Sequence, residues 1–351
     1  RLRDTPLKPG DRVWHVGMDW RSRVVSQKTR VEQIEPLALP LPSPPFFIDT
    51  NIETIDVGQA ARSNGGVLVD RQGRVGALWA SFVDLSGDKP DGFFLGLPAS
   101  YLHDVVDPLR EGRTPFHRSL GVTLGELGLV EARARGLSAE AARLLEEAGG
   151  SARRAFEVLR VAADAPARGQ LQEGDILVTV GGEPAVDLRR IEELSQADAV
   201  EVRLSRQGEE RVETVEPLVR DGQGIRRLVS WGGMLVHEPP ASIAEQRGIE
   251  REGVYVSWYW YGSPAARFGL RPARRILEVD GVPTPDLDAF LAAVADIEDG
   301  GATRILTEDL DRRREMATIE LDLTWWPTWI WERTDAGWQR RALATRRPGS
   351  R

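Results

Sequence analysis

The fold is decided by residues 171–188, LQEGDILVTVGGEPAVDL, a passage that recurs over residues 270–287 as LRPARRILEVDGVPTPDL. The two copies align without a gap when residue 171 is laid on residue 270, so that Gly182 meets Gly281 and both passages end in Asp-Leu. A repeat of about a hundred residues is too long for a solenoid and suits a duplicated small domain. The sequence therefore predicts two domains of one type.

Each copy predicts the same order of elements: turn, strand, turn and helix. In the first copy, residues 174–175 are a turn pair, residues 176–180 are a β-branched apolar run of strand length, and residues 181–184 form a second turn. Asp187 is placed to cap a helix, and Asp286 takes this role in the second copy. The apolar stripes expected on the two helices are Leu188, Ile191 and Leu194, and Leu287, Phe290, Leu291 and Val294.

This order of elements resembles the core of a PDZ domain of the type found in HtrA proteases. Upstream, residues 118–122 (Arg-Ser-Leu-Gly-Val) are similar to the loop and first strand with which such domains hold a peptide C-terminus. Gly121 would let backbone N–H groups converge on a carboxylate, and residues 122–124 would offer an edge strand to an added peptide. The resemblance implies a peptide-binding site made by Arg118, Leu120, Gly121, Val122, Leu188, Ile191 and Leu194.

The matching loop of the second copy is Trp-Gly-Gly-Met-Leu at residues 231–235, which implies a site at Gly232, Gly233, Met234 and Leu235. The flexible side chain of Met234 suits an adaptable pocket. The second copy departs from the pattern at residues 273–274, where Ala-Arg replaces Gly-Asp. The fold is still expected there, but the resemblance does not carry over the ligand preference. Taken singly, a Leu-Gly-Val triplet is an ordinary strand entry and a Leu/Ile stripe is ordinary core. Their order, found twice, favours the binding interpretation.

Composition sets wider bounds on the chain. Its 351 residues are enough for two or three domains, and 41% hydrophobic with 28% charged residues is typical of a soluble globular protein. A net charge of −8 argues against a nucleic-acid partner, because there is no basic surplus to neutralise phosphates. Without cysteine there is no disulfide, thiolate metal site or cysteine nucleophile. No apolar run approaches membrane-spanning length, and no cofactor or metal is predicted.

Residues 1–108 are predicted to be all-β. Short strand-like runs at residues 12–16, 23–25 and 68–70 are separated by turn signals, and residues 37–45 form a proline-rich loop. The most distinctive segment of this part is the glycine-rich stretch within residues 63–75.

Residues 63–75 are similar to the nucleophile region of a trypsin-like HtrA protease, whose pattern is Gly-Asn-Ser-Gly-Gly-Pro-Leu, a turn and a Val-rich strand. Residues 7–13 and 51–55 resemble the start of the family's second barrel and the strand before its nucleophile turn. Taken alone, residues 63–66 would be a plain hairpin turn, since Asn-Gly is a strong turn dipeptide. The matching positions are Gly65, Gly66, Leu68, Gly73 and Val75.

Asn64 occupies the position of the nucleophilic serine, and an amide has no hydroxyl proton for a histidine to remove. Ser63, one place earlier, would point its hydroxyl elsewhere on a tight turn. Arg62 stands where the family has an oxyanion-hole glycine. The histidines lie outside the family's catalytic histidine context and are interpreted as structural or surface residues; they are His15, His103, His117 and His237. The resemblance therefore implies no catalytic residue in this chain.

The whole order resembles the C-terminal half of the long, internally duplicated branch of HtrA proteins, in which the later protease copy is degenerate. The predicted fold class is mainly β with α+β domains: the second β-barrel of a trypsin-like fold followed by two PDZ domains. The expected domains are a degenerate protease half at 1–108, PDZ domains at 116–219 and 226–325, and a Trp-rich extension and tail at 326–351. Because the chain begins with arginine, we expect it to be a fragment or a processed product.

Two further segments carry structural expectations. Residues 137–147 have helical composition, and as an insertion in the first PDZ copy they predict either a lid over the groove or, more plainly, a helix packed on the domain. Residues 325–331 are rich in tryptophan and predict a strand that covers part of the barrel or of a PDZ domain, with the aromatic residues 258–261 as a possible partner. Residues after about 342 are expected to be a disordered basic tail.

Three functions remain open. The first is a PDZ module that binds peptides or unfolded protein segments for an HtrA-like protease, in the process of protein quality control. The second is an active serine endopeptidase, with catalysis upstream in the parent protein. The third is a structural part that assembles a homo-oligomer or docks on an intramolecular protease module. An empty groove beside Gly121 would favour binding, whereas the helix at 137–147 or the tryptophan-rich tail lying in the groove would favour the structural role. The resemblance leaves bacterial periplasm or cytoplasm open, and fungal relatives would suggest the nucleus.

Overall fold

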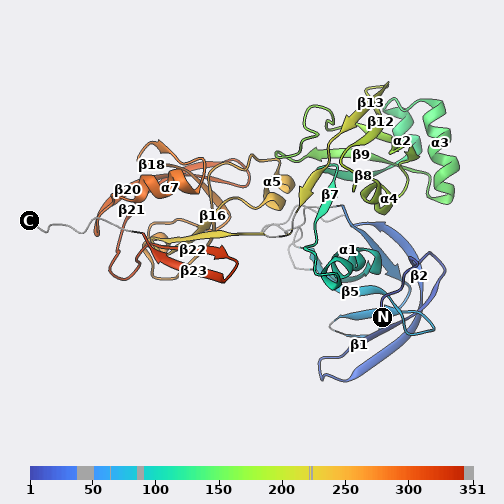
Figure 1. Cartoon of the computed structure of the whole chain (residues 1–351), viewed down its shortest axis with the longest axis horizontal. Coiled ribbons are helices and arrows are strands. Elements are labelled where there is room, and N and C mark those ends of the chain that lie inside the picture. Colours follow the sequence, from blue (N-terminus) through green and yellow to red (C-terminus); the bar gives the residue numbers. More distant parts are fainter. Residues whose placement is uncertain (38–50, 64, 85–90, 221, 223, 344–351) are drawn as a thin grey trace, which may run out of the picture. The chain divides into compact units, whose positions relative to one another are not determined.

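The computed structural model describes residues 1–37, 51–63, 65–84, 91–220, 222 and 224–343 (Figure 1). The proline-rich segment expected at 37–45 and the basic tail expected after 342 lie almost wholly outside these residues. The chain divides into two compact units, residues 1–45 with 50–222 and residues 46–49 with 223–351. No helix of the described part is long and apolar enough to cross a membrane.

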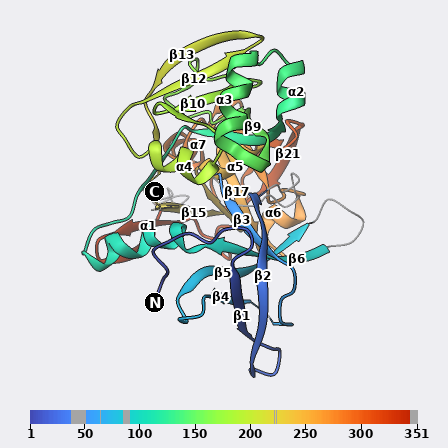
Figure 2. The same ribbon diagram turned by 90° about the vertical axis from the view of Figure 1, so that its right-hand side faces the viewer.

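The first unit begins with a closed barrel of strands in the order β1-β2-β3-β6-β5-β4. The barrel is filled by small and branched side chains that are fully buried, among them Val13, Leu68 and Ala77. This all-β region agrees with the mainly β class predicted from the sequence. The strands and the helix that follows them are β1 Arg12–Met18, β2 Val24–Pro36, β3 Glu53–Val57, β4 Gly66–Val69, β5 Val75–Asp84, β6 Asp91–Pro98 and α1 Ala99–Arg110 (Figure 2).

The second part of this unit is a mixed domain around a sheet of order β13-β12-β10-β9-β8, in which β8 is an edge strand. A separate pair joins β7 to β14, and β11 pairs with β10. The elements are β7 His117–Ser119, β8 Val122–Gly128, α2 Leu129–Ala134, α3 Ala139–Gly149, β9 Arg154–Val161, β10 Ile176–Val180, β11 Glu183–Pro184, α4 Leu188–Leu194, β12 Val200–Arg206, β13 Glu209–Val215 and β14 Leu218–Arg220.

The helix predicted at 137–147 is present as α3, capped by the side chain of Ser138, and it lies beside α2 (Figures 1 and 2). Val178 of β10 packs in the cluster that contains α2 and α3, whereas its neighbour Leu177 packs in the cluster that contains α4. Successive side chains of a strand point to opposite faces of the sheet. Helix α3 therefore covers the face opposite α4 and is a packed helix, not a lid over the groove.

The second unit holds one long sheet of order β21-β20-β18-β17-β16-β15-β22-β23, with β19 paired to β18. Its helix α7 packs on this sheet through the stripe predicted from the sequence, since all four stripe residues are buried. The elements are β15 Arg227–Trp231, β16 Met234–His237, α5 Ala241–Arg247, β17 Val254–Tyr259, α6 Pro264–Arg267, β18 Arg274–Val279, β19 Val282–Pro283, α7 Leu287–Val294, β20 Ala302–Asp309, β21 Arg314–Glu320, β22 Trp329–Thr334 and β23 Gly337–Ala342.

The sequence repeat is also a repeat of local structure. The strand predicted at 176–180 is β10, and its pairing with β12 shifts register between Leu177 and Thr179; β18 shifts against β20 between Ile276 and Glu278, at the same place in the alignment. The side chain of Asp187 accepts the N–H of Arg190, and Asp286 caps α7 in the same way. The residues that the ungapped alignment makes equivalent are therefore also equivalent in structure, including the position of a β-bulge.

The departure at residues 273–274 has a structural counterpart. In the first copy, the buried Asp175, just before β10, forms an ion pair with the partly buried Arg206 at the end of β12. In the second copy, Arg274 lies opposite Asp309, so the signs of the charges at this pair of positions are exchanged. One position along the strand, Arg275 and Glu308 form a buried ion pair of their own. The exchange of Asp for Arg thus leaves the fold intact.

The tryptophan-rich segment forms part of the second unit. Residues 329–334 form β22, which pairs with β15 on one side and β23 on the other. Trp326 lies against Trp260 with ring centroids 6.4 Å apart, so the predicted partnership with the aromatic residues 258–261 is confirmed. The guanidinium of Arg340 lies over the ring of Trp329 at 4.1 Å from its centroid. The segment extends the sheet beyond β15.

Candidate functional site

The strand predicted to receive a peptide in the first domain is β8, and only one of its edges is used by a strand. β8 pairs with β9 along its length, and within the described part of the chain no strand pairs with its other edge. Two backbone groups on that outer edge are taken by the side chain of Asn51: its Nδ2 donates to the carbonyl of Val122 at 2.9 Å, and its Oδ1 accepts the N–H of Leu124 at 2.8 Å. A carboxamide carries the same donor and acceptor as a peptide group. Asn51 therefore takes the place that one peptide group of an added strand would take.

The loop before β8 is closely packed. Gly121 has φ of +69°, and a Cβ at this position would lie 2.6 Å from the Cβ of Ala165. Its N–H donates to Oγ of Ser119 at 3.2 Å, and the side chain of Leu120 is buried. The predicted site residue Arg118 points to the end of α4, where its guanidinium donates to the carbonyl of Gln196 at 3.2 Å. The loop has the sharp turn expected of a carboxylate-binding loop, and its Gly121 amide already has an acceptor.

The helix α4 forms the other wall. Leu188 and Ile191 are buried in the same core cluster as Val122, and Leu194 packs at its margin, so the side chains expected to line the groove also form the core. The polar residue of this wall is Glu192, which is only 1% exposed. Its carboxylate accepts hydrogen bonds from Nδ2 of Asn51 at 3.1 Å and from Nε2 of His117 at 2.9 Å.

Glu192 was missed by the sequence interpretation. The available signal was its spacing: residues 188, 192 and 195 are separated by four and three positions and so share one helix face. An acidic residue on the apolar face of a helix is a buried charge that needs partners. Asn51 was missed for another reason, because it lies 71 residues before its partner Val122 and nothing local in the sequence connects them.

A second carboxylate, Glu53, lies beside Asn51 on the same segment. Its Oε1 accepts the N–H of Leu188 at the start of α4 at 3.2 Å and lies 3.4 Å from Nη2 of Arg154. Burial raises the pKa of Glu53 to about 7, and the nearby carboxylate of Asp187 adds to this rise, while Arg154 opposes it. The N–H of Glu53 donates to the hydroxyl of Tyr101 on α1. Glu53 is therefore a buried acid that titrates near neutral pH.

Glu53→Gln should change how stability depends on pH. The folded pKa of about 7 lies above the ordinary value of 4.5, so the stabilisation from Glu53 is complete below pH 4.5 and is lost as pH rises to 7. We expect the free energy of unfolding of wild type, relative to Glu53→Gln, to fall by up to about 3 kcal/mol over this range. Urea titrations at several pH values measure this difference.

The histidine contribution to pH dependence cancels in this comparison. Burial lowers the pKa of His15, which adds stability as pH rises, but it does so equally in both proteins. Glu111→Gln, at an exposed carboxyl, is the matched control for the loss of one carboxylate and is measured alongside. Parallel profiles for wild type and Glu53→Gln would contradict the buried-acid assignment.

The corresponding loop of the second domain is arranged differently. Gly232 and Gly233, with φ of +56° and +72°, form the turn of a tight hairpin that joins β15 to β16. Met234 lies opposite Trp231 of β15 on one side and Tyr259 of β17 on the other, and Leu235 is likewise paired on both sides, with Ser230 and Trp258. An added strand therefore has no free edge at Met234 or Leu235.

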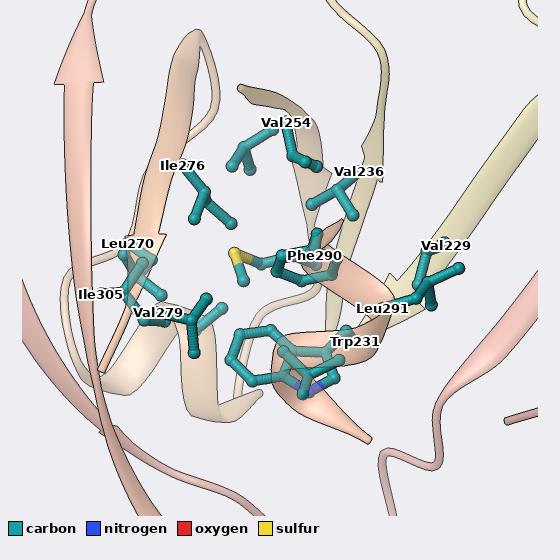
Figure 3. Close-up of a cluster of buried hydrophobic side chains, with 14 of the residues drawn as sticks. Val229, Trp231, Val236, Val254, Leu270, Ile276, Val279, Phe290, Leu291 and Ile305 are labelled. Carbon is teal, nitrogen blue, oxygen red and sulfur yellow. The ribbon is translucent and has the colours of Figure 1, made fainter. Parts of the chain in front are cut away.

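A tryptophan also fills the space beside the second groove helix. Trp231 is buried and its ring meets that of Phe290 on α7 edge to face, with centroids 5.4 Å apart. Figure 3 shows Trp231 next to Phe290 and Leu291 within the core of this domain. Strand β15 of the chain itself thus pairs with β16 and places the side chain of Trp231 against α7, as a bound peptide strand and its side chain would do.

The nucleophile turn holds a serine–histidine contact that the sequence interpretation did not anticipate. Asn64, at the nucleophile position, lies outside the described residues, and Arg62 is exposed. Oγ of Ser63 lies 3.3 Å from Nε2 of His15, and it donates to the carbonyl of Gly65 at 2.8 Å. His15 comes from β1 and is fully buried, which agrees with its interpretation as a structural histidine.

The hydrogen bonds around His15 determine which ring nitrogen carries the proton, and this tautomer does not allow His15 to act as a base toward Ser63. Nδ1 accepts the N–H of Ala61 at 2.9 Å, so in the neutral ring the proton is on Nε2, the nitrogen that faces Ser63. A general base must present a lone pair to the hydroxyl that it activates. Burial lowers the pKa of His15, which keeps the ring neutral. In this arrangement His15 donates to Ser63 and does not activate it.

Comparison with known proteins finds a PDZ-like family and two proteases that are similar to this chain. A family profile described as PDZ-like domain matches residues 225–300, from β15 through α7. The chain is 30% identical to Protease Do-like 7 of Arabidopsis thaliana over 97% of this chain and 34% of that protein, and 29% identical to a pro-apoptotic serine protease of Yarrowia lipolytica over 93% of this chain and 34% of that protein. The chain thus spans about a third of the length of these curated relatives.

A solved structure of the HtrA-type protease AlgW with a tripeptide is also similar, at 20% identity over 61% of this chain and 66% of that chain, with a TM-score of 0.39. This score is too low to establish a shared arrangement. The closed barrel, the PDZ-like match and the relatives fit the predicted trypsin-like barrel followed by PDZ structure. The chain therefore carries a PDZ-like domain and is similar, over almost its whole length, to one third of these curated proteases.

Proposed function

We propose that this chain is a peptide-binding part of an HtrA-like protease, in which the first PDZ domain binds extended segments or C-termini and the barrel does not cleave them. The observation that carries this proposal is the outer edge of β8, where backbone groups of Val122 and Leu124 are bonded to a side chain and not to a strand. Backbone groups at such an edge give affinity for an extended peptide, and the side chains of the groove give selectivity.

The second PDZ domain has a different role in this proposal. Because β15 already pairs with β16, and Trp231 packs on α7, this domain is complemented by its own chain. These observations favour a structural role for the second domain, which corresponds to the third function considered from the sequence. A homo-oligomer or an intramolecular protease module is the assembly that such a part would serve.

A binding experiment tests the proposal. The full chain is presented with a library of decapeptides that have free or amidated C-termini, and amide hydrogen exchange is followed by mass spectrometry, with casein digestion measured in parallel. We expect peptide-dependent protection at residues 120–126 and no digestion of casein. Protection confined to residues 232–236, or no binding by any peptide, would contradict the assignment to the first domain. A preference for free C-termini would extend the role of Gly121 to carboxylate recognition.

The absence of catalysis is tested by restoring the family's serine. Asn64→Ser should leave casein hydrolysis at the background rate, because the neighbouring His15 carries its proton on the nitrogen that faces the turn and offers no base. Hydrolysis is measured by release of a fluorescent label, with Ser63→Ala in the same background as the matched control. Turnover that appears in Asn64→Ser and survives Ser63→Ala would contradict the proposal.

The names of the relatives favour an endopeptidase activity for the parent protein. Both relatives are named as proteases, one of them as a serine protease, and this chain matches only about a third of each. In our proposal the catalytic module belongs to the part of the parent protein that lies outside this chain. The chain itself recognises segments for it.

A further inference from the structure

Asn51 is held at the edge of the first PDZ domain by the barrel segment that carries it. Residues 51–53 enter β3 of the barrel, and Asn51 and Glu53 both contact the PDZ domain, at β8 and at the start of α4. The carboxamide of Asn51 forms hydrogen bonds there to Val122, Leu124 and Glu192. Together they join both walls of the groove through one side chain.

A separate set of contacts joins helix α1, which follows the barrel strands, to helix α4 of the domain. Arg189 of α4 donates to both carboxylate oxygens of Asp104 on α1, the longer bond being 2.9 Å, and its guanidinium lies 5.0 Å from the ring centroid of Tyr101. Tyr101 in turn accepts the N–H of Glu53. Such a bidentate pair is geometrically specific. The barrel and the domain therefore also meet outside the groove, through an ion pair that touches neither β8 nor Asn51.

We propose that Asn51 is an internal ligand of the first PDZ domain, and that an extended segment binds β8 only by displacing it. The inference rests on the proposed function and adds its regulation. Because the amide of Asn51 bonds to the outward carbonyl of Val122 and the outward N–H of Leu124, a peptide strand and Asn51 cannot use these groups together. Binding and release of Asn51 are then one exchange, so peptide occupancy loosens the contact between the barrel and the domain.

The exchange also selects the ligand. Glu192 is buried, and the departure of Asn51 takes away one of its two hydrogen-bond donors and leaves His117. A buried carboxylate that loses a donor carries a desolvation cost unless the incoming group replaces it. The displacing segment should therefore bring an amide or a cationic side chain, from asparagine, glutamine, lysine or arginine, to the position that faces Glu192. Aspartate or glutamate there should be disfavoured.

Two variants of Asn51 test the exchange. Asn51→Ala removes both hydrogen bonds to β8, and Asn51→Asp keeps the shape but turns the donor into a second acceptor facing Val122 and Glu192. We expect the amide of Leu124 to exchange faster in both variants, and the affinity for library decapeptides to rise on the order of tenfold in Asn51→Ala, the value of losing two competing hydrogen bonds. Asparagine- and lysine-containing peptides should be enriched over aspartate-containing ones in the wild type.

The matched control is Asp104→Asn, which breaks the ion pair with Arg189 and leaves the bonds of Asn51 in place. Its Leu124 exchange and peptide affinity should stay within about twofold of wild type. A gain equal to that of Asn51→Ala would assign the effect to general loosening and overturn the proposal.

If wild type binds peptides and Asn51→Ala binds no better, the internal-ligand inference fails and the proposed function stands. If no form binds any peptide, the proposed function fails. Circular dichroism melting curves of each variant show whether the fold is retained.

Discussion

Trp231→Ala should lower the free energy of unfolding of the second unit by about 3–5 kcal/mol, the usual cost of truncating a large aromatic side chain in a core. The side chain is 1% exposed and meets Phe290 edge to face, so its removal leaves a cavity between β15 and α7 that neighbouring groups cannot fill. Urea unfolding of the full chain, followed by far-ultraviolet circular dichroism, measures the loss. Tryptophan fluorescence is unsuitable, because the variant has lost one of the 11 tryptophans and its signal cannot be compared directly with that of wild type.

The control for this variant is Trp325→Ala. Trp325 belongs to the same unit and is 79% exposed, so its replacement should change stability by less than about 0.5 kcal/mol. A loss below about 1 kcal/mol in Trp231→Ala would mean that the groove of the second domain is not closed by this side chain. In that case the structural role proposed for the second domain would be withdrawn.

Asp175→Ala should destabilise the first unit by about 3–5 kcal/mol, because it leaves the partly buried guanidinium of Arg206 without its counter-charge. Both carboxylate oxygens of Asp175 lie 2.7 Å from nitrogen atoms of Arg206, and one of them also accepts the N–H of Gln172 at 2.8 Å. The side chain of Asp175 is fully buried. The same urea titration measures this loss, in the transition that belongs to residues 1–222.

A double replacement separates the charge effect from packing. Asp175→Leu with Arg206→Met removes both charges and keeps apolar volume, and it should recover most of the stability lost in Asp175→Ala, since buried ion pairs are often replaced by apolar residues at little cost. If the double variant is as unstable as Asp175→Ala, the hydrogen bond to Gln172 would carry the stabilisation in place of the ion pair.

Much of the fold was accessible from local patterns. The β-branched run at 176–180 became β10, and Asp187 and Asp286 became helix caps, because these features depend on a few neighbouring residues. The internal repeat added long-range information, since an ungapped offset predicted two domains with equivalent strands. The choice between a lid and a packed helix at 137–147 was left open, because an amphipathic helix does not itself specify which face of a sheet it covers.

The sequence by itself determined the mainly β class and the repeated strand and helix, and it placed asparagine at position 64, where the resembling proteases have serine. Only the tertiary structure decided which of the two strands, β8 or β16, has an edge without a partner strand in the described part of the chain. The two strands follow similar loops, but only β16 pairs with the strand before it. It also brought Asn51 to Val122, and Ser63 to the protonated nitrogen of His15. These contacts join residues 46 or more positions apart, and hydrogen bonds at such separations depend on how strands meet in space, which no local periodicity records.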